Sequence, residues 1–135
     1  ISLMTGDRHL KYIYKLEIRS QCEPSIISRI LGTESSATDG GWWCLEVEQE
    51  EHDPPYDFVS AFLHILDGKF DDLQRLGITR DCIAMWLYYE YDHNQECNLE
   101  FSPQQTKRLG EAGLTRCVSC WEKGSWLVFG EKGDG

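Results

Sequence analysis

The run at 40–48, Gly-Gly-Trp-Trp-Cys-Leu-Glu-Val-Glu, constrains this chain more than any other stretch. Two glycines allow a turn without steric cost, and the residues after them read as an extended strand. Because consecutive strand residues face opposite sides, Trp43 shares an apolar face with Leu45 and Val47 and is expected in the core. Trp42 starts the opposite face, which becomes acidic along the strand. We therefore expect one tryptophan inside the molecule and the other under a helix or on a binding surface.

The composition is that of one ordinary globular domain. The chain has 135 residues, of which 41% are hydrophobic and 27% charged, enough for one sizeable core. We expect a flexible segment at 1–11, one domain at 12–129 and a flexible tail at 130–135. No apolar run is long enough to cross a bilayer, and no signal segment opens the chain. These features predict a cytoplasmic protein that does not bind membranes.

The negative charge is concentrated in the middle of the chain. The net charge is −10. Between Glu34 and Glu100 the sequence contains sixteen acidic residues and only three basic ones, Lys69, Arg75 and Arg80. Proteins that bind nucleic acid need clustered lysine and arginine, so this distribution argues against a nucleic-acid partner. It favours a protein partner with a basic surface. The alternative is an acidic surface that is merely solvated.

Hydrophobic periodicity and capping residues predict an alternation of strands and helices. Asp53 is expected to cap a helix that begins at Pro54, and Ser102 to cap the next long helix, which ends near Gly110 or Gly113. The predicted strands are Tyr12 to Arg19, the tryptophan strand, Asp81 to Tyr91, Cys97 to Phe101, Leu114 to Trp121 and an edge strand at Ser125 to Phe129. The first predicted helix starts at Pro24 and stops at Gly32. The next carries the apolar stripe Phe58, Phe62 and Leu66, and a short second helix follows over Phe70, Leu73 and Leu76, closed by Gly77.

This order predicts an α+β fold with one mixed, mostly antiparallel sheet and helices packed mainly on one face. The strand at Asp81 to Tyr91 is apolar on both faces, so it is expected either to be covered on both sides or to lie in the centre of the sheet, and to pair in a hairpin with Cys97 to Phe101. The strand at Leu114 to Trp121 is expected to be a core strand. The predicted core comprises Trp43, Leu45, Val47, Phe58, Phe62, Trp86 and Val118, with Tyr88, Tyr89 and Tyr91 also mostly buried.

Several short motifs occur in an order that matches a known family. They are Tyr14-Lys15-Leu16-Glu17-Ile18, Glu23-Pro24 with Ile27 and Ile30-Leu31-Gly32, Gly41-Trp42-Trp43-Cys44-Leu45, Phe101-Ser102-Pro103, Leu109-Gly110 and Gly113-Leu114. With this ordered set the chain resembles bacterial domain-of-unknown-function family 4279 over about residues 12–121. The family usually has a proline after the Leu-Gly pair, where this chain has Glu34-Ser35-Ser36. The family has no assigned reaction, so the resemblance implies a fold and not an activity.

The residues that could carry chemistry have simpler structural interpretations. Cys117 and Cys120 have the spacing of a redox or zinc pair, but in a strand they face opposite ways, and only Cys97 with His93 could complete a zinc site. All six cysteines are expected to be reduced and metal-free. No catalytic or phosphate-binding motif is present. The sequence therefore predicts no cofactor, no metal and no catalytic residue.

The leading functional hypothesis is a non-enzymatic protein-binding domain, and its most concrete form is an immunity-type protein that neutralises a toxin. The acidic run after the tryptophans repels itself, so a basic partner would offset that repulsion. The alternative use of the run is to protect an edge strand from aggregation. The rival function is a small-molecule-binding or enzymatic domain with a pocket between sheet and helices. The predicted partner-binding residues are Trp42, Glu46, Glu48, Glu50, Glu51 and Asp53.

Overall fold

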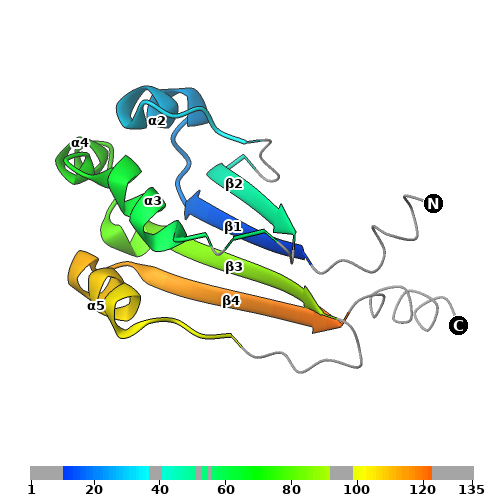
Figure 1. Ribbon diagram of the computed structural model, residues 1–135. Coiled ribbons are helices and arrows are strands. Elements are labelled where there is room, and N and C mark those ends of the chain that lie inside the picture. The colour runs from blue at the N-terminus through cyan, green and yellow to red at the C-terminus, as the bar shows by residue number, and fades with distance from the viewer. Residues whose placement is uncertain (1–10, 37–40, 51–52, 55, 92–98, 123–135) are drawn as a thin grey trace, which may run out of the picture.

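The computed structural model describes residues 11–36, 41–50, 53–54, 56–91 and 99–122. Strands and helices alternate along the chain, as Figure 1 shows. The strands are β1 (Lys11–Ile18), β2 (Trp43–Glu50), β3 (Ile83–Tyr91) and β4 (Thr115–Glu122). The helices are α2 (Pro24–Leu31), α3 (Phe58–Leu66), α4 (Phe70–Arg75) and α5 (Pro103–Ala112), with a 3₁₀ turn at Arg80–Cys82 before β3.

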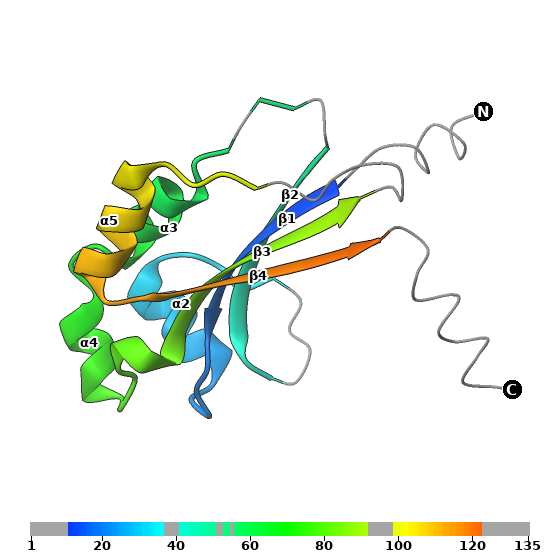
Figure 2. The same ribbon diagram turned by 90° about the horizontal axis from the view of Figure 1, so that it is seen from below.

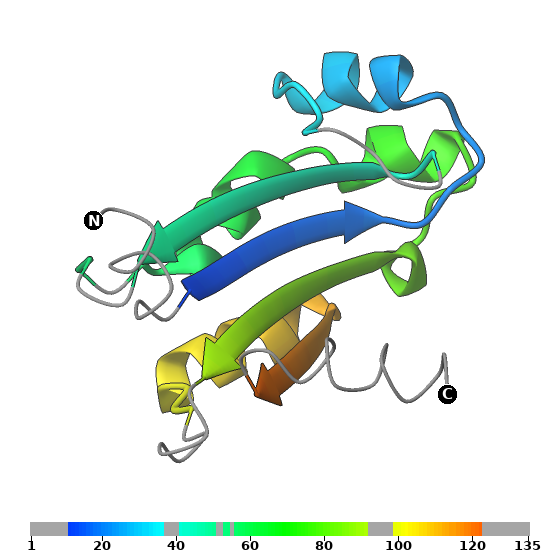
Figure 3. The ribbon, with the colours of Figure 1, turned by 90° about the vertical axis from the view of Figure 1, so that its right-hand side faces the viewer.

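The strands form one mixed sheet in the order β2-β1-β3-β4. β1 pairs antiparallel with both β2 and β3, and β4 joins β3 in parallel. The helices lie together on one face of this sheet (Figures 1 and 2), and Figure 3 looks onto the opposite face. We call the helix-covered face the inner face and the other the outer face. The predicted α+β fold with helices on one face is confirmed, as is the central position of β3.

Local signals in the sequence set the ends of two helices. α2 starts at Pro24 and stops at Gly32, whose φ of 67° is the left-handed conformation that glycine adopts without strain. α5 starts with a capping box in which the Ser102 hydroxyl accepts from the Gln105 N–H at 3.1 Å and the Gln105 side chain accepts from the Ser102 N–H at 3.2 Å. It continues through Gly110 and ends at Gly113. Both predicted starts are confirmed.

The core lies between the inner face and the helices. Leu16, Trp43, Phe62 and Met85 are fully buried there, with Phe58 almost so. The Trp43 indole N–H donates to the Ser28 hydroxyl of α2 at 3.0 Å, so its one polar group is satisfied. The predicted core positions of Trp43, Phe58 and Phe62 are confirmed. Leu45 and Val47 share that face and are half-buried against the core.

Two predicted core residues lie elsewhere. Trp86 alternates with buried Leu87 on β3, and it is half-buried on the outer face beside half-buried Tyr88. Val118 is 42% exposed because β4 is the last described strand of the sheet and has a neighbour on one side only. The prediction that β4 is a core strand is therefore wrong, although Tyr89 of β3 is buried as expected.

Two boundary predictions are also wrong. α3 begins at Phe58 with Asp57 as its cap, and Asp53 and Pro54 precede the helix. Residues 99–101 form no strand and lead directly into α5. The remainder of that predicted strand and the hairpin turn lie outside the described residues, as do the predicted strand at Ser125 to Phe129 and nearly all of the two terminal segments.

Candidate functional site

The outer face of β2 carries part of the acidic surface that the sequence predicts. Glu46 and Glu48 occupy alternate positions of the strand and are exposed. Trp42 immediately precedes β2 and is 39% exposed, while its neighbour Trp43 is fully buried. The opposite environments predicted for the two tryptophans are confirmed. β2 is also an edge strand in the described sheet, so this surface is at the rim of the molecule.

The neighbouring strand β1 places Lys15 opposite Glu46, but the Lys15 side chain contacts Glu17. Lys15 of β1 is opposite Glu46 in the strand register. Its Nζ lies 3.4 Å from a carboxylate oxygen of Glu17 and 5.3 Å from the centre of the Tyr88 ring, on the side of β3. Among the described residues, no ion pair involves Glu46. The Glu46 charge is therefore left facing solvent.

Glu17 has the opposite environment on the same face. It is only 8% exposed, and its Oε1 accepts hydrogen bonds from Arg19 Nε at 2.9 Å and from the Trp86 indole N–H at 3.0 Å. Burial by itself raises the pKa of Glu17, but these hydrogen bonds and the charges of Lys15 and Arg19 outweigh burial and lower it below the usual 4.5. Glu17 is thus a paired structural carboxylate.

Side chains from both flanking loops cap the open edge of β2. The Ser35 hydroxyl accepts from the Cys44 N–H at 3.3 Å, and the Ser36 hydroxyl accepts from the Glu46 N–H at 3.0 Å. At the other end, Asp53 Oδ2 accepts from the Glu50 N–H at 2.9 Å. These groups occupy donors that another strand would need for pairing, so the edge is protected at these positions by hydrogen bonds as well as by charge.

The structure divides the predicted partner-binding residues into two groups. Glu46 and Glu48 lie on one surface with Trp42 just before them, as predicted. Asp53 folds back onto the end of β2, and Asp53 and Glu50 border a cavity of the inner face. Glu51 lies outside the described residues.

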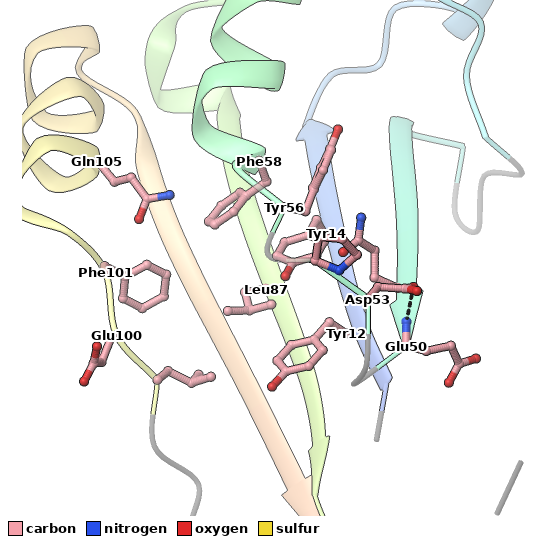
Figure 4. A pocket seen from close by; sticks show the side chains of 13 residues that line it. Tyr12, Tyr14, Glu50, Asp53, Tyr56, Phe58, Leu87, Glu100, Phe101 and Gln105 are labelled. Carbon is pink, nitrogen blue, oxygen red and sulfur yellow. Dashed lines mark hydrogen bonds between the residues drawn. The ribbon is translucent and has the colours of Figure 1, made fainter. Parts of the chain in front are cut away.

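That cavity lies between the inner face of the sheet and the segments that lead into α3 and α5, and it has a volume of about 340 Å³. Figure 4 shows aromatic rings around it. Its aromatic lining consists of Tyr12, Tyr14, Tyr56, Phe58 and Phe101, and its acidic lining of Glu50, Asp53 and Glu100. It is a pocket between sheet and helices, the type of feature expected of the rival function.

The aromatic rings pack against one another around Tyr14. The ring centre of Tyr14 is 5.1 Å from that of Phe58, 5.3 Å from that of Tyr56 and 6.4 Å from that of Tyr12. Tyr14 is 9% exposed. Burial raises the pKa of its hydroxyl, and the neighbouring hydroxyls of Tyr12 and Tyr56 raise it further. Tyr14 therefore stays protonated and neutral at physiological pH.

Sequence reasoning did not identify this cavity. The alternation of β1 places Tyr12 and Tyr14 on the inner face, and that pattern alone reads as core. A possible signal was the choice of two tyrosines, because a buried tyrosine needs a partner for its hydroxyl where phenylalanine would not. The other lining residues come from segments distant in sequence, so only the folded chain brings them together.

The other candidate chemistry does not assemble in the part of the chain that the structure describes. There, no group of three or more histidine, cysteine, aspartate or glutamate side chains could hold a metal ion. Cys117 and Cys120 lie on opposite faces of β4, and none of the five described cysteines is bonded to another described one. Reduced, metal-free thiols stay a prediction, because Cys97 and His93 are not described. His64 is exposed on α3.

No helix of the described residues has the length and apolarity needed to cross a membrane. In comparisons with models of protein families, with curated proteins and with solved structures, no match to this chain is found. The resemblance to bacterial domain-of-unknown-function family 4279 therefore stays a prediction.

Proposed function

We propose that the protein is a non-enzymatic, cytoplasmic binding domain whose outer face at β2 engages a basic surface of another protein. In its most specific form it is an immunity-type protein, and the partner is a toxin that it neutralises. The observation that carries the proposal is the pair Glu46 and Glu48, both exposed on an edge strand next to exposed Trp42.

The direction of Lys15 supports this proposal. A lysine directly opposite Glu46 could neutralise it across the strands, since such pairs have Cβ atoms about 5 Å apart. Instead Lys15 contacts Glu17 and lies over the rings of Trp86 and Tyr88. The cost of an uncompensated charge at the rim is offset when a basic surface approaches, and the same charge speeds the encounter.

The capping of the β2 edge defines how a partner would bind. Ser35, Ser36 and Asp53 already accept from the edge N–H groups of Cys44, Glu46 and Glu50. A partner would therefore contact side chains of the outer face and would not add a strand there. Exposed Trp42 supplies the kind of apolar anchor that dominates binding energy at interfaces.

Charge reversal tests the proposal. The immobilised domain is exposed to a lysate of its source organism, and the retained proteins are identified by mass spectrometry. We expect wild type to retain a basic protein that is released as salt rises, and the double variant Glu46→Lys/Glu48→Lys to lose it. Expressed alone, that protein should arrest growth, and wild type but not the double variant should restore it.

The matched control reverses two exposed acids on the helical side, Asp71→Lys/Glu111→Lys. It changes the net charge by the same amount, so it should retain the partner if the position of the charge matters. Trp42→Ala should weaken retention without changing charge. Equal retention by wild type and the Glu46→Lys/Glu48→Lys variant would refute binding through this face.

A further inference from the structure

The cavity of the inner face is walled by aromatic rings on several sides. Tyr12 and Tyr14 come from β1, Tyr56 from the segment before α3, Phe58 from the first position of α3, and Phe101 from the segment before α5. Figure 4 shows these side chains around one space, with Leu87 at its base. The electron-rich faces of tyrosine and phenylalanine attract cations, and enclosures of such rings bind methylated ammonium groups.

The charged residues of the described lining are all acidic. Glu100 lies on the side of α5 and Asp53 on the side of β2, so one carboxylate flanks the cavity on each side, whereas the Glu50 side chain points away from it (Figure 4). No lysine or arginine is among the described lining residues. Arg116 places its guanidinium carbon 3.9 Å from the centre of the Phe101 ring, so one face of that ring is already covered by a cation of the protein.

The cavity also contains a buried polar group that needs a partner. Tyr14 is nine-tenths buried, and its hydroxyl makes no hydrogen bond with any described residue. Buried polar groups are nearly always hydrogen-bonded, to protein, water or ligand. A ligand with a hydroxyl or carbonyl next to its cationic group would satisfy it.

We propose that this cavity binds a small organic cation, an ammonium ion with methyl groups and a short polar tail. The rings of Tyr12, Tyr14 and Tyr56, which pack against one another, would contact the methyl groups from the cavity wall. The flanking carboxylates would favour the positive charge, and the Tyr14 hydroxyl would bond the polar tail. The volume of about 340 Å³ suits a ligand of this size. An anion would be repelled by the carboxylates. A bare metal ion has no cluster of ligands in the described residues.

This site is independent of the proposed protein-binding surface. The cavity is on the inner face, whereas Glu46 and Glu48 are on the outer face. A protein that binds the cation but retains no partner would disprove the proposed function alone, and the reverse result would disprove only the site.

The test uses choline and its uncharged analogue of the same shape, 3,3-dimethylbutan-1-ol. Binding to the full chain is followed by titration calorimetry and by shifts of the tyrosine ring signals in NMR spectra. We expect choline to bind at least about fivefold more tightly than the neutral analogue, and its affinity to fall as salt rises. Equal binding of the two, or no binding of choline, would overturn the proposal.

Variants identify the site. Glu100→Gln should lower the affinity for choline severalfold. The control Glu111→Gln removes an exposed acid of α5 outside the lining and should leave the affinity for choline unchanged. Tyr12→Leu should lower the affinity for choline about fivefold and change the affinity for the neutral analogue little. Glu100 is exposed, so its variant tests the site even if Tyr12→Leu fails to fold. Unchanged affinity in both variants, or displacement of choline by equimolar magnesium, would contradict the assignment.

Discussion

Two glutamates on the outer face show how differently the fold uses the same residue. Glu17 is 8% exposed and receives hydrogen bonds from Arg19 and Trp86, whereas Glu46 is exposed and pairs with no described cation. The difference arises because Lys15, which lies between them on the face, is directed toward Glu17. Glu17 therefore contributes to stability, and Glu46 is available for binding.

Glu17 should make the stability of the protein sensitive to acid. Its pKa is lower in the folded protein than the usual 4.5, so its contribution is complete above about pH 4.5 and is lost as the pH falls through the folded-state pKa. Glu17→Gln should lower the free energy of unfolding at pH 7 by about 1–3 kcal/mol, because Arg19 and Trp86 lose a charged acceptor. Urea unfolding at several pH values measures this.

The deficit of the Glu17→Gln variant should shrink below pH 4.5, since wild type then loses the same interaction. Glu46→Gln is the control on the same face, and it should change the free energy of unfolding by less than about 0.5 kcal/mol at pH 7. A deficit of Glu17→Gln that stays constant from pH 7 to pH 3 would exclude the charged pairing of Glu17.

At the scale of elements, the first turns of α3 and α5 are joined to each other. Asp57 caps α3 by accepting from the Ser60 N–H at 3.1 Å, and it also accepts from the Gln105 side chain of α5 at 3.3 Å. The hydrogen bonds from Ser60 lower the pKa of Asp57. Arg108 of α5 donates in turn to the Ser60 hydroxyl. The two caps thus fix the segments that line the cavity.

Asp57→Ala should lower the free energy of unfolding by about 1–2 kcal/mol, because it removes the α3 cap and the contact with Gln105. Asp53→Ala is the comparison, since Asp53 accepts from the N–H of Glu50 at the end of a strand and caps no helix. It should cost clearly less. Urea unfolding of both variants measures the difference, and equal losses would mean that the cap at Asp57 contributes nothing specific.

At the scale of the whole molecule, one core on one face of the sheet supports the entire fold. The buried cluster joins β1, β2 and β3 with all the described helices, for example through Leu16, Phe62 and Leu73. Apart from buried Glu17, the described charged and aromatic side chains of the outer face are half-buried or exposed. The inner face therefore carries the core, and none of the described helices covers the outer face.

The asymmetry predicts that shortening two hydrophobic side chains to alanine lowers the free energy of unfolding by very different amounts. Phe62 is fully buried, so Phe62→Ala should cost about 3–5 kcal/mol, close to the whole stability of a marginal domain. Val118 is 42% exposed at the edge, so Val118→Ala should cost less than about 0.5 kcal/mol. Denaturation midpoints test both, and an unchanged midpoint for Phe62→Ala would contradict the core.

Local features of the sequence were sufficient for the elements that depend on nearby residues. The capping box at Ser102 and Gln105, and the stop at Gly32, act within one helical turn, so the sequence alone predicts them. The contrast between Trp42 and Trp43 follows from strand alternation and the apolar residues that accompany Trp43. These parts of the fold rest on contacts between close neighbours in the chain.

Features that depend on distant contacts required the tertiary structure. Alternation places Trp86 and Tyr89 on opposite faces of β3, but only the position of the helices decides which face is buried. The segments β1–α2–β2 and β3–α5–β4 have similar local patterns, yet the first strand pair is antiparallel and the second parallel. The connection after β3 returns along the sheet before β4 begins, and no local signal encodes that direction. The sequence determined most of the elements, the capped start of α5, the stop of α2 and the acidic strand, but not the cap of α3. Packing across the sheet decided the edge position of Val118 and the cavity around Tyr14, because both require residues far apart in the chain to meet.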